Sequence, residues 1–313
     1  MNMLVPSRRN LHAGAYSLYF PRILFFFLVV VTLLGCASAN ISLPAVVERP
    51  TGLSLPGKVV WRDLITHKPA ESRRFYEALF GWEFEDVGVK IGPFRSVNYT
   101  LIRHEGLLIG GLVDANLLGR GDAEEISQWV VVMSVEDVDV AVATAAAQGG
   151  TVRHLPVDLD TRGRLAIIED AQGAELALLQ TRDGDPPDAP LGIGHFLWDE
   201  VWSNDPEGSV SFYQKLAGLK KTESGDYLLL SSGDTPRVGV LPTPLPEIPS
   251  TWVSYVRVAD ADAITAKVEA LGGQVIIGVT QRDIGGEAAL IVDPSGAGIA
   301  VQTWTPRSDS ARL

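Results

Sequence analysis

The stretch VVWRDLITHKPAESRRFYEALFGW, residues 59–82, recurs in related form as HFLWDEVWSNDPEGSVSFYQKLAGL, residues 195–219. The shared Phe-Tyr pair sets the two copies 137 residues apart. Farther along the chain, DVDVAVATAAAQGGTV at 137–152 resembles DADAITAKVEALGGQV at 260–275. Because the repeat is longer than about 100 residues, each copy is a domain and not one turn of a solenoid.

Composition limits the partners that this chain can have. It has 313 residues, of which 46% are hydrophobic and 20% charged, which is enough for two domains with substantial cores. The net charge is −12, and residues 1–36 hold three arginines and no acid, so the remainder carries −15. A surface this acidic repels phosphate backbones, so we expect no nucleic-acid partner.

The N-terminus has the pattern of a lipoprotein signal peptide at residues 1–36. Three arginines precede an apolar run, ILFFFLVVVTLL at 23–34, which ends in Leu-Leu-Gly-Cys. Cys36 is the only cysteine and stands at the cleavage position, which resembles a bacterial lipobox. We therefore predict lipidation of Cys36, a membrane anchor and a periplasmic or extracellular location in the bacterial cell envelope.

Other interpretations of the N-terminus stay open. It could be an ordinary signal peptide with an incidental cysteine, or a retained single-span anchor. Ser7-Arg8-Arg9 faintly resembles a twin-arginine signal, although the apolar run starts far downstream. Residues 37–57 contain three prolines and several small residues and are predicted to form an extended tether.

Hydrophobic periodicity predicts the same order of elements in both halves. After the strand at 59–65, a helix begins at Pro69 and carries Phe75, Tyr76 and Leu79 on one face. Further elements of the first half are expected at 96–103, 107–113, 129–135, 137–148 (helix), 165–168 and 175–180. Those of the second half are expected at 195–202, 206 onward (helix), 227–230, 237–241, 252–258, 260–271 (helix), 288–292 and 299–303. The predicted domains are 58–183 and 192–305, joined by a linker at 184–191 and followed by a tail at 306–313.

These landmarks, with DAQGA from Asp170 matched by DPSGA from Asp293, resemble the vicinal oxygen chelate superfamily. That superfamily includes glyoxalase I, bleomycin-resistance proteins and extradiol dioxygenases, and the fit is best to its tandem glyoxalase-like branch. The resemblance implies an α+β fold. Two tandem modules would each be built from paired βαβββ units, whose curled mixed sheets form a cup.

The resemblance also implies where a divalent metal would bind, on His, Gln or Glu side chains from the cup floor. In this chain those positions hold residues that cannot bind a metal through their side chains: Trp61, Trp198, Ala177, Ala300 and, approximately, Val130 and Val253. We therefore predict no metal ion and no other cofactor in the cups.

Two acids are the candidate catalytic residues. Side chains alternate along a strand, so Asp63 shares a face with Trp61, and Glu200 shares one with Phe196, Trp198 and Trp202. Asp63 and Glu200 could act as a general acid or base in an apolar cup. Alternatively, each binds neighbouring backbone or arginine groups and only stabilises its module.

The tryptophans Trp61, Trp198 and Trp202 are the candidate ligand-binding residues, because they could stack on a flat molecule. They could equally fill the volume that a lost metal site leaves. The histidines, including His104 and His195, are expected to face solvent. Gly106, Gly110 and Gly111 are interpreted as turn and strand-packing glycines.

Three functions remain possible. The leading hypothesis is a lipid-anchored protein that binds a small, partly aromatic molecule without the usual divalent metal. The second is a metal-independent lyase or isomerase that uses a cup acid. The third is a structural or interaction protein whose cups are filled by its own side chains. Whether the chain is an enzyme, and its oligomeric state, stay open at this level.

Overall fold

The computed structural model describes residues 41–91, 95–118, 127–188, 192–224, 227–245 and 247–304. The predicted signal peptide with Cys36, the first residues of the predicted tether and the predicted tail at 306–313 lie outside these ranges. Within the described ranges, no helix is both long and apolar enough to cross a bilayer.

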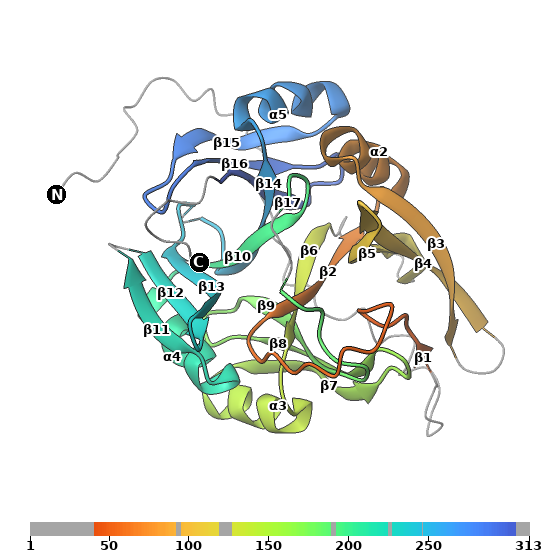
Figure 1. Ribbon diagram of the computed structural model, residues 1–313, viewed down its shortest axis with the longest axis vertical. Coiled ribbons are helices and arrows are strands. Elements are labelled where there is room, and N and C mark those ends of the chain that lie inside the picture. The colour runs from red at the N-terminus through yellow and green to blue at the C-terminus, as the bar shows by residue number, and fades with distance from the viewer. Residues whose placement is uncertain are drawn as a thin grey trace.

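The first module forms one nine-stranded sheet in the order β1-β3-β4-β5-β2-β6-β9-β8-β7 (Figure 1). Its two βαβββ units join through the antiparallel pair β2 and β6, and each unit closes with a parallel pair, β2 with β5 and β6 with β9. The elements are β1 (Ile41–Ser42), β2 (Val59–Thr66), α2 (Pro69–Phe80), β3 (Glu83–Ile91), β4 (Arg95–His104), β5 (Leu107–Asp114), a 3-10 turn (Ala115–Leu118), β6 (Gln128–Ser134), α3 (Val138–Ala147), β7 (Thr151–Asp158), β8 (Gly163–Glu169) and β9 (Glu175–Thr181).

The second module repeats this plan in an eight-stranded sheet, β11-β12-β13-β10-β14-β17-β16-β15. Its elements are β10 (Phe196–Ser203), α4 (Pro206–Ala217), β11 (Lys220–Ser224), β12 (Tyr227–Ser232), β13 (Thr235–Pro242), β14 (Thr251–Val258), α5 (Ala261–Val268), a 3-10 turn (Glu269–Leu271), β15 (Gln274–Gln281), β16 (Glu287–Val292) and β17 (Gly298–Thr303). The predicted α+β architecture of two tandem modules with curled sheets is confirmed.

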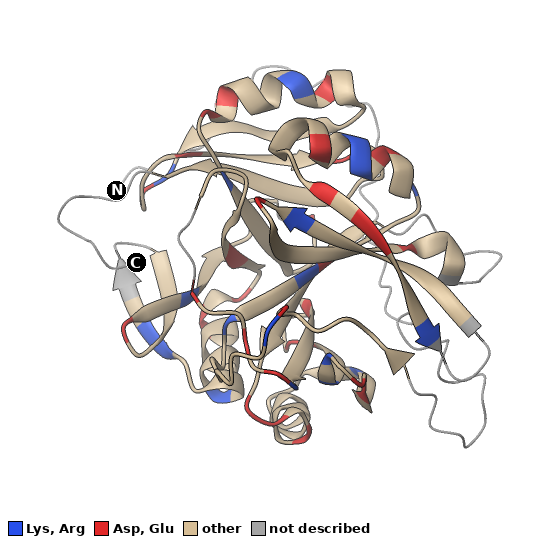
Figure 2. Ribbon diagram, turned by 45° about the vertical axis from the view of Figure 1, so that its right-hand side comes forward, with Lys and Arg blue, Asp and Glu red and all other residues tan. Residues whose placement is uncertain are grey.

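Besides the two-residue β1, the structure adds four strands that the sequence pattern did not predict: β3, β7, β11 and β15. Each of these four follows a helix or the 3-10 turn that ends it, and each lies at or next to an edge of its sheet. Figure 2 shows acidic residues along β3, and β7 alternates exposed with half-buried side chains. Edge strands bury little, so their hydrophobic alternation is weak.

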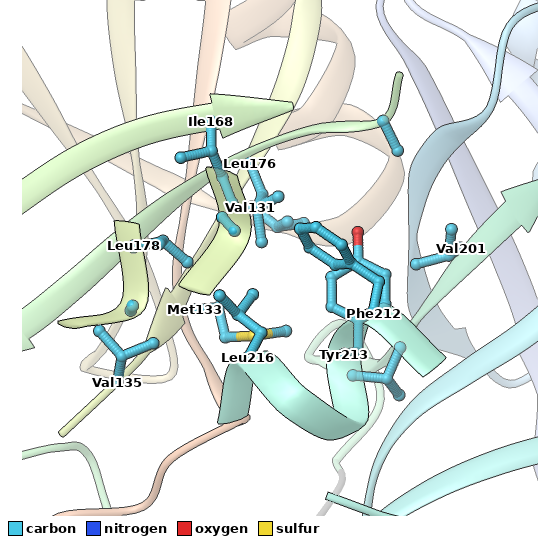
Figure 3. Close-up of a cluster of buried hydrophobic side chains, with 14 of the residues drawn as sticks. Val131, Met133, Val135, Ile168, Leu176, Leu178, Val201, Phe212, Tyr213 and Leu216 are labelled. Carbon is cyan, nitrogen blue, oxygen red and sulfur yellow. The ribbon is translucent and has the colours of Figure 1, made fainter. Parts of the chain in front are cut away.

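The helices connect the two modules into shared cores. Figure 1 shows α2 beside α5 at one end and α3 beside α4 at the other. In Figure 3, Phe212 and Leu216 of α4 lie against Val131 and Met133 of β6, a strand of the other module. Burying each side chain of this size stabilises the fold by about 1.5–3 kcal/mol. The modules therefore stabilise each other.

Equivalent positions of the two modules also pair directly. Arg62 and Asp199 stand 137 residues apart, as the repeat does, and they form a buried ion pair with Arg62 Nε 2.9 Å from Asp199 Oδ1. The Arg62 guanidinium lies 4.2 Å from the ring centre of Phe196. Ser254 donates a hydrogen bond to Asp199 over 2.6 Å. This contact fixes β2 and β10 side by side.

A bulge changes the side-chain alternation at the start of both β2 and β10. The register shifts between Val59 and Trp61 and, at the equivalent place, between Phe196 and Trp198. Phe196 consequently packs among the side chains around α2 and α5, on the helix side of the sheet. The expectation that Phe196 faces the cup with Trp198 is therefore wrong, because simple alternation does not hold across a bulge.

The starts of α2 and α4 differ between the two copies. Asp205 accepts a hydrogen bond from the backbone N–H of Gly208 and caps α4, whereas Lys68 makes no side-chain cap for α2. The Thr66 hydroxyl accepts from the N–H of Lys68, which precedes α2. The equivalent hydroxyl of Ser203 accepts from the N–H of Asp205. Both copies thus keep the turn before the helix, and only the second copy has the cap.

Candidate functional site

Acid, aromatic and arginine side chains meet on the floor of the first cup. Asp63 of β2 accepts hydrogen bonds at Oδ1 from the Tyr99 hydroxyl (2.6 Å) and from Trp61 Nε1 (3.0 Å). Arg162, between β7 and β8, donates to the Tyr99 hydroxyl (3.3 Å) and places Nη1 3.8 Å from Asp63 Oδ2. All four side chains are buried. A guanidinium therefore neutralises this carboxylate inside the module.

The second cup repeats the arrangement around Glu200 of β10, which is 0% exposed. Its carboxylate accepts hydrogen bonds from Tyr227 (2.8 Å), Tyr255 (2.5 Å) and Trp202 Nε1 (3.1 Å). Arg282, which follows β15, donates to the same carboxylate and to the Tyr255 hydroxyl. Both cup acids are therefore held by tyrosine, tryptophan and arginine donors, of which the structural alternative for these residues named only arginine.

Two glycines make room for these networks. An added Cβ at Gly111 would lie 1.8 Å from the Tyr99 hydroxyl and 2.5 Å from Asp63 Oδ1. At Gly239 it would lie 1.8 Å from the Tyr227 hydroxyl. Gly111 is thus a packing glycine on β5, as predicted, and its purpose is close approach to a buried polar group.

The network fixes protonation states. Burial, together with the nearby Glu200 carboxylate, raises the pKa of Tyr227 and Tyr255 well above the ordinary value. Burial also raises the pKa of Tyr99. Burial lowers the pKa of Arg282, but the Glu200 carboxylate outweighs it and leaves that pKa raised. The tyrosines therefore remain neutral donors, and the arginine stays charged.

Residues from the predicted tether occupy the first cup. Ile41, Leu43 and Val46 are buried among the cup side chains, and β1 pairs with β3. Arg162 Nε donates to the carbonyl oxygen of Pro44 over 2.8 Å. From residue 41 onward this segment is packed against the module, so it differs from the extended tether that its prolines and small residues suggested.

The second cup is filled from its own module. Leu245 and Ile248, from the loop between β13 and β14, pack with Trp304, which follows β17. They cover Val253 of β14 and Ala300 of β17. Apart from the half-buried Trp198, the described residues of both cup floors are therefore buried, as expected if the chain's own side chains fill the cups.

The positions of the superfamily's metal ligands do not fit a metal ion. Strand pairing aligns Trp61 with Val132 and Ala177 in the first module. It aligns Trp198 with Tyr255 and Ala300 in the second. The approximate positions Val130 and Val253 are displaced by two residues, since they pair with Asp63 and Glu200. Indole, isopropyl and methyl groups supply no metal ligand, and the Tyr255 hydroxyl already donates to Glu200.

A cavity of about 330 Å³ lies where the modules meet, and we call it the junction pocket. Its walls come from the starts of β2, β5, β10 and β13 and from linker residues 186–188. Trp198, Trp304 and Phe196 supply aromatic surface, and Lys58 and Arg237 supply cationic groups. This volume lies within the range of small-molecule sites.

Electrostatics at the rim of the junction pocket centre on Asp188. Lys58 Nζ lies 2.9 Å and Arg237 Nη1 2.7 Å from Asp188 Oδ1. Burial lowers the pKa of Lys58 even though Asp188 opposes the shift. Partial burial raises the pKa of Asp188, but Arg237 and Lys58 lower it more strongly, so the carboxylate stays ionised. Two cations therefore share one acid at this rim.

The predicted site residues divide into two groups. Trp61, Asp63, Glu200 and Trp202 belong to the buried cup networks. Trp198 alone of the five lines the junction pocket, where its ring stacks on Tyr227 with centroids 5.4 Å apart. Its indole N–H is buried and has no hydrogen-bond partner among the described residues. An acceptor on a bound molecule could satisfy this donor.

Sequence reasoning missed the partners of the acids: Tyr99, Arg162, Tyr227, Tyr255 and Arg282. The sequence held one signal for the tyrosines, because Tyr99 and Tyr227 each precede their packing glycine, Gly111 or Gly239, by twelve residues.

The expectation that the histidines face solvent is wrong for two of them. His104 is only 9% exposed, and the His195 side chain is 13% exposed. Neither could be foreseen without the contact between the modules.

The model of the Glyoxalase/Bleomycin resistance protein/Dioxygenase superfamily matches residues 58–178 and again residues 192–301. The chain belongs to this superfamily. The resemblance that the duplicated sequence suggested is therefore confirmed, and the matched ranges correspond to the two modules.

Relatives with similar sequences span most of the chain. The putative glyoxylase CFP32 of Mycobacterium tuberculosis (strain CDC 1551 / Oshkosh) is 29% identical over 253 residues, covering 79% of this chain and 95% of the relative. The anthracycline biosynthesis protein DauV of Streptomyces sp. (strain C5) is 26% identical over 265 residues, covering 79% and 93%.

Solved structures share the fold at low identity. The Mn(II)-bound glyoxalase from Novosphingobium aromaticivorans has a TM-score of 0.54 at 15% identity, covering 80% of this chain and 83% of that one. The 2,3-dioxygenase LapB from Pseudomonas sp. KL28 has a TM-score of 0.52 at 12% identity, covering 83% and 97%. At this identity the likeness is one of fold.

Proposed function

We propose that this superfamily member is a lipid-anchored protein that binds a small, partly aromatic molecule without the superfamily's usual divalent metal. The binding place in this proposal is the junction pocket. The proposal rests on the contrast between the cup floors and the lining of the junction pocket. The cup floors are buried and internally paired, whereas the junction pocket combines Trp198 and Trp304 with Lys58 and Arg237 around about 330 Å³.

The lining indicates the class of ligand. Aromatic rings at Trp198 and Trp304 suit a planar molecule, and the two cations beside Asp188 suit a carboxylate or phenolate substituent. The unpaired indole N–H of Trp198 suits an oxygen acceptor. Two relatives are named as anthracycline biosynthesis proteins, and an aromatic ligand is compatible with that name.

Metal independence of the cups rests on the two arginines. A guanidinium beside Asp63 or Glu200 supplies the positive charge that each buried acid needs. A divalent cation placed next to it would meet strong repulsion in an apolar environment. The same pairing argues against the metal-independent enzyme of the second hypothesis, since Glu200 is fully buried and its two carboxylate oxygens already accept from four donors.

A ligand screen tests the binding proposal. Planar aromatic acids and phenols are added to the purified protein, and melting temperature and tryptophan fluorescence are measured. Thr235 lines the junction pocket at an exposed position, so Thr235→Trp should block it and weaken any hit at least tenfold. Asp234→Trp on the same turn is the matched control and should leave affinity unchanged. A screen without any stabilising compound, or hits that Thr235→Trp leaves intact, would overturn the proposal.

The lipid anchor is tested separately. Because Ile41 already packs against the first module, only residues 37–40 would separate it from a lipidated Cys36. Five residue steps reach at most ~18 Å, so the anchor would hold the edge formed by β1 and β3 close to the membrane. Metabolic labelling with a palmitate analogue should mark the wild-type protein and not Cys36→Ala. Equal labelling of both would disprove this part.

A further inference from the structure

Two histidines and one glutamate converge where the first module touches the start of β10. His104 ends β4, Glu105 stands in the turn to β5, and His195 precedes β10. Each offers one ligand atom, and these atoms all lie within 4.8 Å of one another. His195 Nε2 and Glu105 Oε2 are 3.3 Å apart, and the two imidazole centres are 4.6 Å apart.

The hydrogen bonding of His104 fixes which ring nitrogen is free. Its Nε2 lies 2.9 Å from the carbonyl oxygen of Ile193, which can only accept, so Nε2 carries the proton. Nδ1 then holds a bare lone pair, and it is buried without a hydrogen-bond partner among the described residues. Metal-binding histidines commonly have this form, with one nitrogen donating to a backbone carbonyl and the other on the metal.

The backbone of the second module is shaped to reach the cluster. A Cβ at Gly194 would lie 2.4 Å from His104 Nε2, and one at Gly192 would lie 2.9 Å from His195 Cδ2. Gly194 has φ +82°, a conformation that favours glycine. These glycines let the segment before β10 pass directly beneath both rings. A larger residue at either place would force the imidazoles apart.

The duplicated copy shows that the fold does not require these donors. By the repeat, the position of His195 corresponds to Lys58 and that of His104 corresponds to Ser232. At the equivalent junction Lys58 and Arg237 are paired with Asp188. One junction thus holds an ordinary ion-pair network, while the other holds nitrogen and oxygen ligands with an unpaired lone pair.

We propose that His104, Glu105 and His195 bind one divalent transition-metal ion of the Zn²⁺ class. Two imidazoles and one carboxylate suit zinc, nickel or cobalt, whereas Mg²⁺ and Ca²⁺ prefer oxygen ligands. Zinc bonds of about 2.1 Å put tetrahedral ligands roughly 3.4 Å apart. The three ligand atoms now lie within 4.8 Å of one another, so they must come closer together to bind zinc. The Glu105 side chain is 70% exposed and can move toward the two imidazoles.

The site also adjoins the junction pocket, because His195 lines it. Three protein ligands leave one coordination position for water or for an oxygen atom of a bound molecule. A metal there would connect the two modules and give the pocket a Lewis-acidic group. The metal site stands on its own contacts and does not depend on the aromatic ligand proposed above.

Metal titration tests the site. The protein is stripped with a chelator, and Zn²⁺ binding is measured by calorimetry, with Co²⁺ absorption as a spectroscopic readout of nitrogen and oxygen ligation. We expect one ion per chain with at least tenfold weaker binding in Glu105→Gln and His195→Ala. His154→Ala, a histidine outside the cluster, should bind like wild type.

Glu105 is exposed in a surface turn, so Glu105→Gln should fold normally even if changes at His104 do not. The site is disproved if wild type binds no stoichiometric ion, or if Glu105→Gln and His195→Ala bind as tightly as wild type. Measuring aromatic ligands on chelated protein separates a failure of this site from a failure of the proposed ligand binding.

Discussion

Replacement of Glu200 by glutamine tests whether the cup acid of the second module is structural or catalytic. The carboxylate is 0% exposed and accepts from Tyr227, Tyr255, Trp202 and Arg282. A glutamine of nearly equal volume removes the charge and points N–H donors at groups that are themselves donors. The Arg282 guanidinium, with only 16% of its side chain exposed, then loses its counter-charge.

The magnitude follows from the pairing of Glu200 with Arg282. Removing one partner of a buried ion pair costs about 3–5 kcal/mol, because the other charge stays buried and uncompensated. Arg282 keeps some contact with solvent, so we expect a loss near the lower limit, about 3 kcal/mol. In a domain pair of this size that corresponds to a fall in melting temperature of roughly 6–12 °C.

Urea unfolding of the purified chain, followed by intrinsic fluorescence, measures the loss. Glu207→Gln is the matched control, since Glu207 pairs with Lys221 on the surface and should cost less than about 1 kcal/mol. The double variant Glu200→Gln with Arg282→Met should recover much of the stability, because no buried charge remains. If Glu200→Gln alone changes the free energy of unfolding by less than about 1 kcal/mol, the structural interpretation is refuted. A catalytic role for Glu200 would then be favoured.

Three further predictions concern the free energy of unfolding, measured by denaturation of single variants. Leu43→Ala should cost about 2–3 kcal/mol because Leu43 is buried in the first cup; no loss would mean that this segment is not docked in solution. Asp205→Ala should cost ~1 kcal/mol as a lost helix cap, and Lys68→Ala at the equivalent position clearly less. Burial, then Glu169, raises the pKa of Glu175 from 4.5 to about 8, so the folded state holds this proton more tightly than the unfolded state. Stability should therefore fall as pH rises from 4.5 to 8, and Glu175→Gln should remove that fall, being more stable than wild type at pH 9 but not at pH 4.

The architecture was predictable because the buried parts of the chain repeat. The central strands β2, β6, β10 and β14 are mostly buried on both faces, and Phe75, Tyr76 and Leu79 give α2 its helical period. The edge strands were missed because solvent covers part of their surface and their alternation is weak. Residues 41–47 were misjudged for the opposite reason. Prolines suggested an open linker, but Ile41, Leu43 and Val46 supply enough apolar surface to dock it.

The site was only partly predictable because its contacts join distant segments. Parity along a strand correctly placed Asp63 beside Trp61 and Glu200 beside Trp202, and the structure brings each pair into hydrogen bonding. Their arginine partners lie 99 and 82 residues away in sequence, at turns whose length differs between the copies. Local patterns carry no information on such pairs, and they carry none on the meeting of His104 with His195 across the modules.

In both cups an arginine side chain neutralises the buried acid. A carboxylate surrounded by aromatic side chains is costly to bury unless a cation accompanies it. In this chain Arg162 and Arg282 provide that cation, although they stand eight and eleven residues before their matching aspartates, Asp170 and Asp293. A guanidinium donates hydrogen bonds but has no coordination position to offer a substrate oxygen. This pairing is the basis of our proposal that the cup floors do not use the superfamily's metal chemistry. At the junction of the modules, by contrast, His104 Nδ1 keeps an unpaired lone pair and Trp198 Nε1 an unpaired N–H.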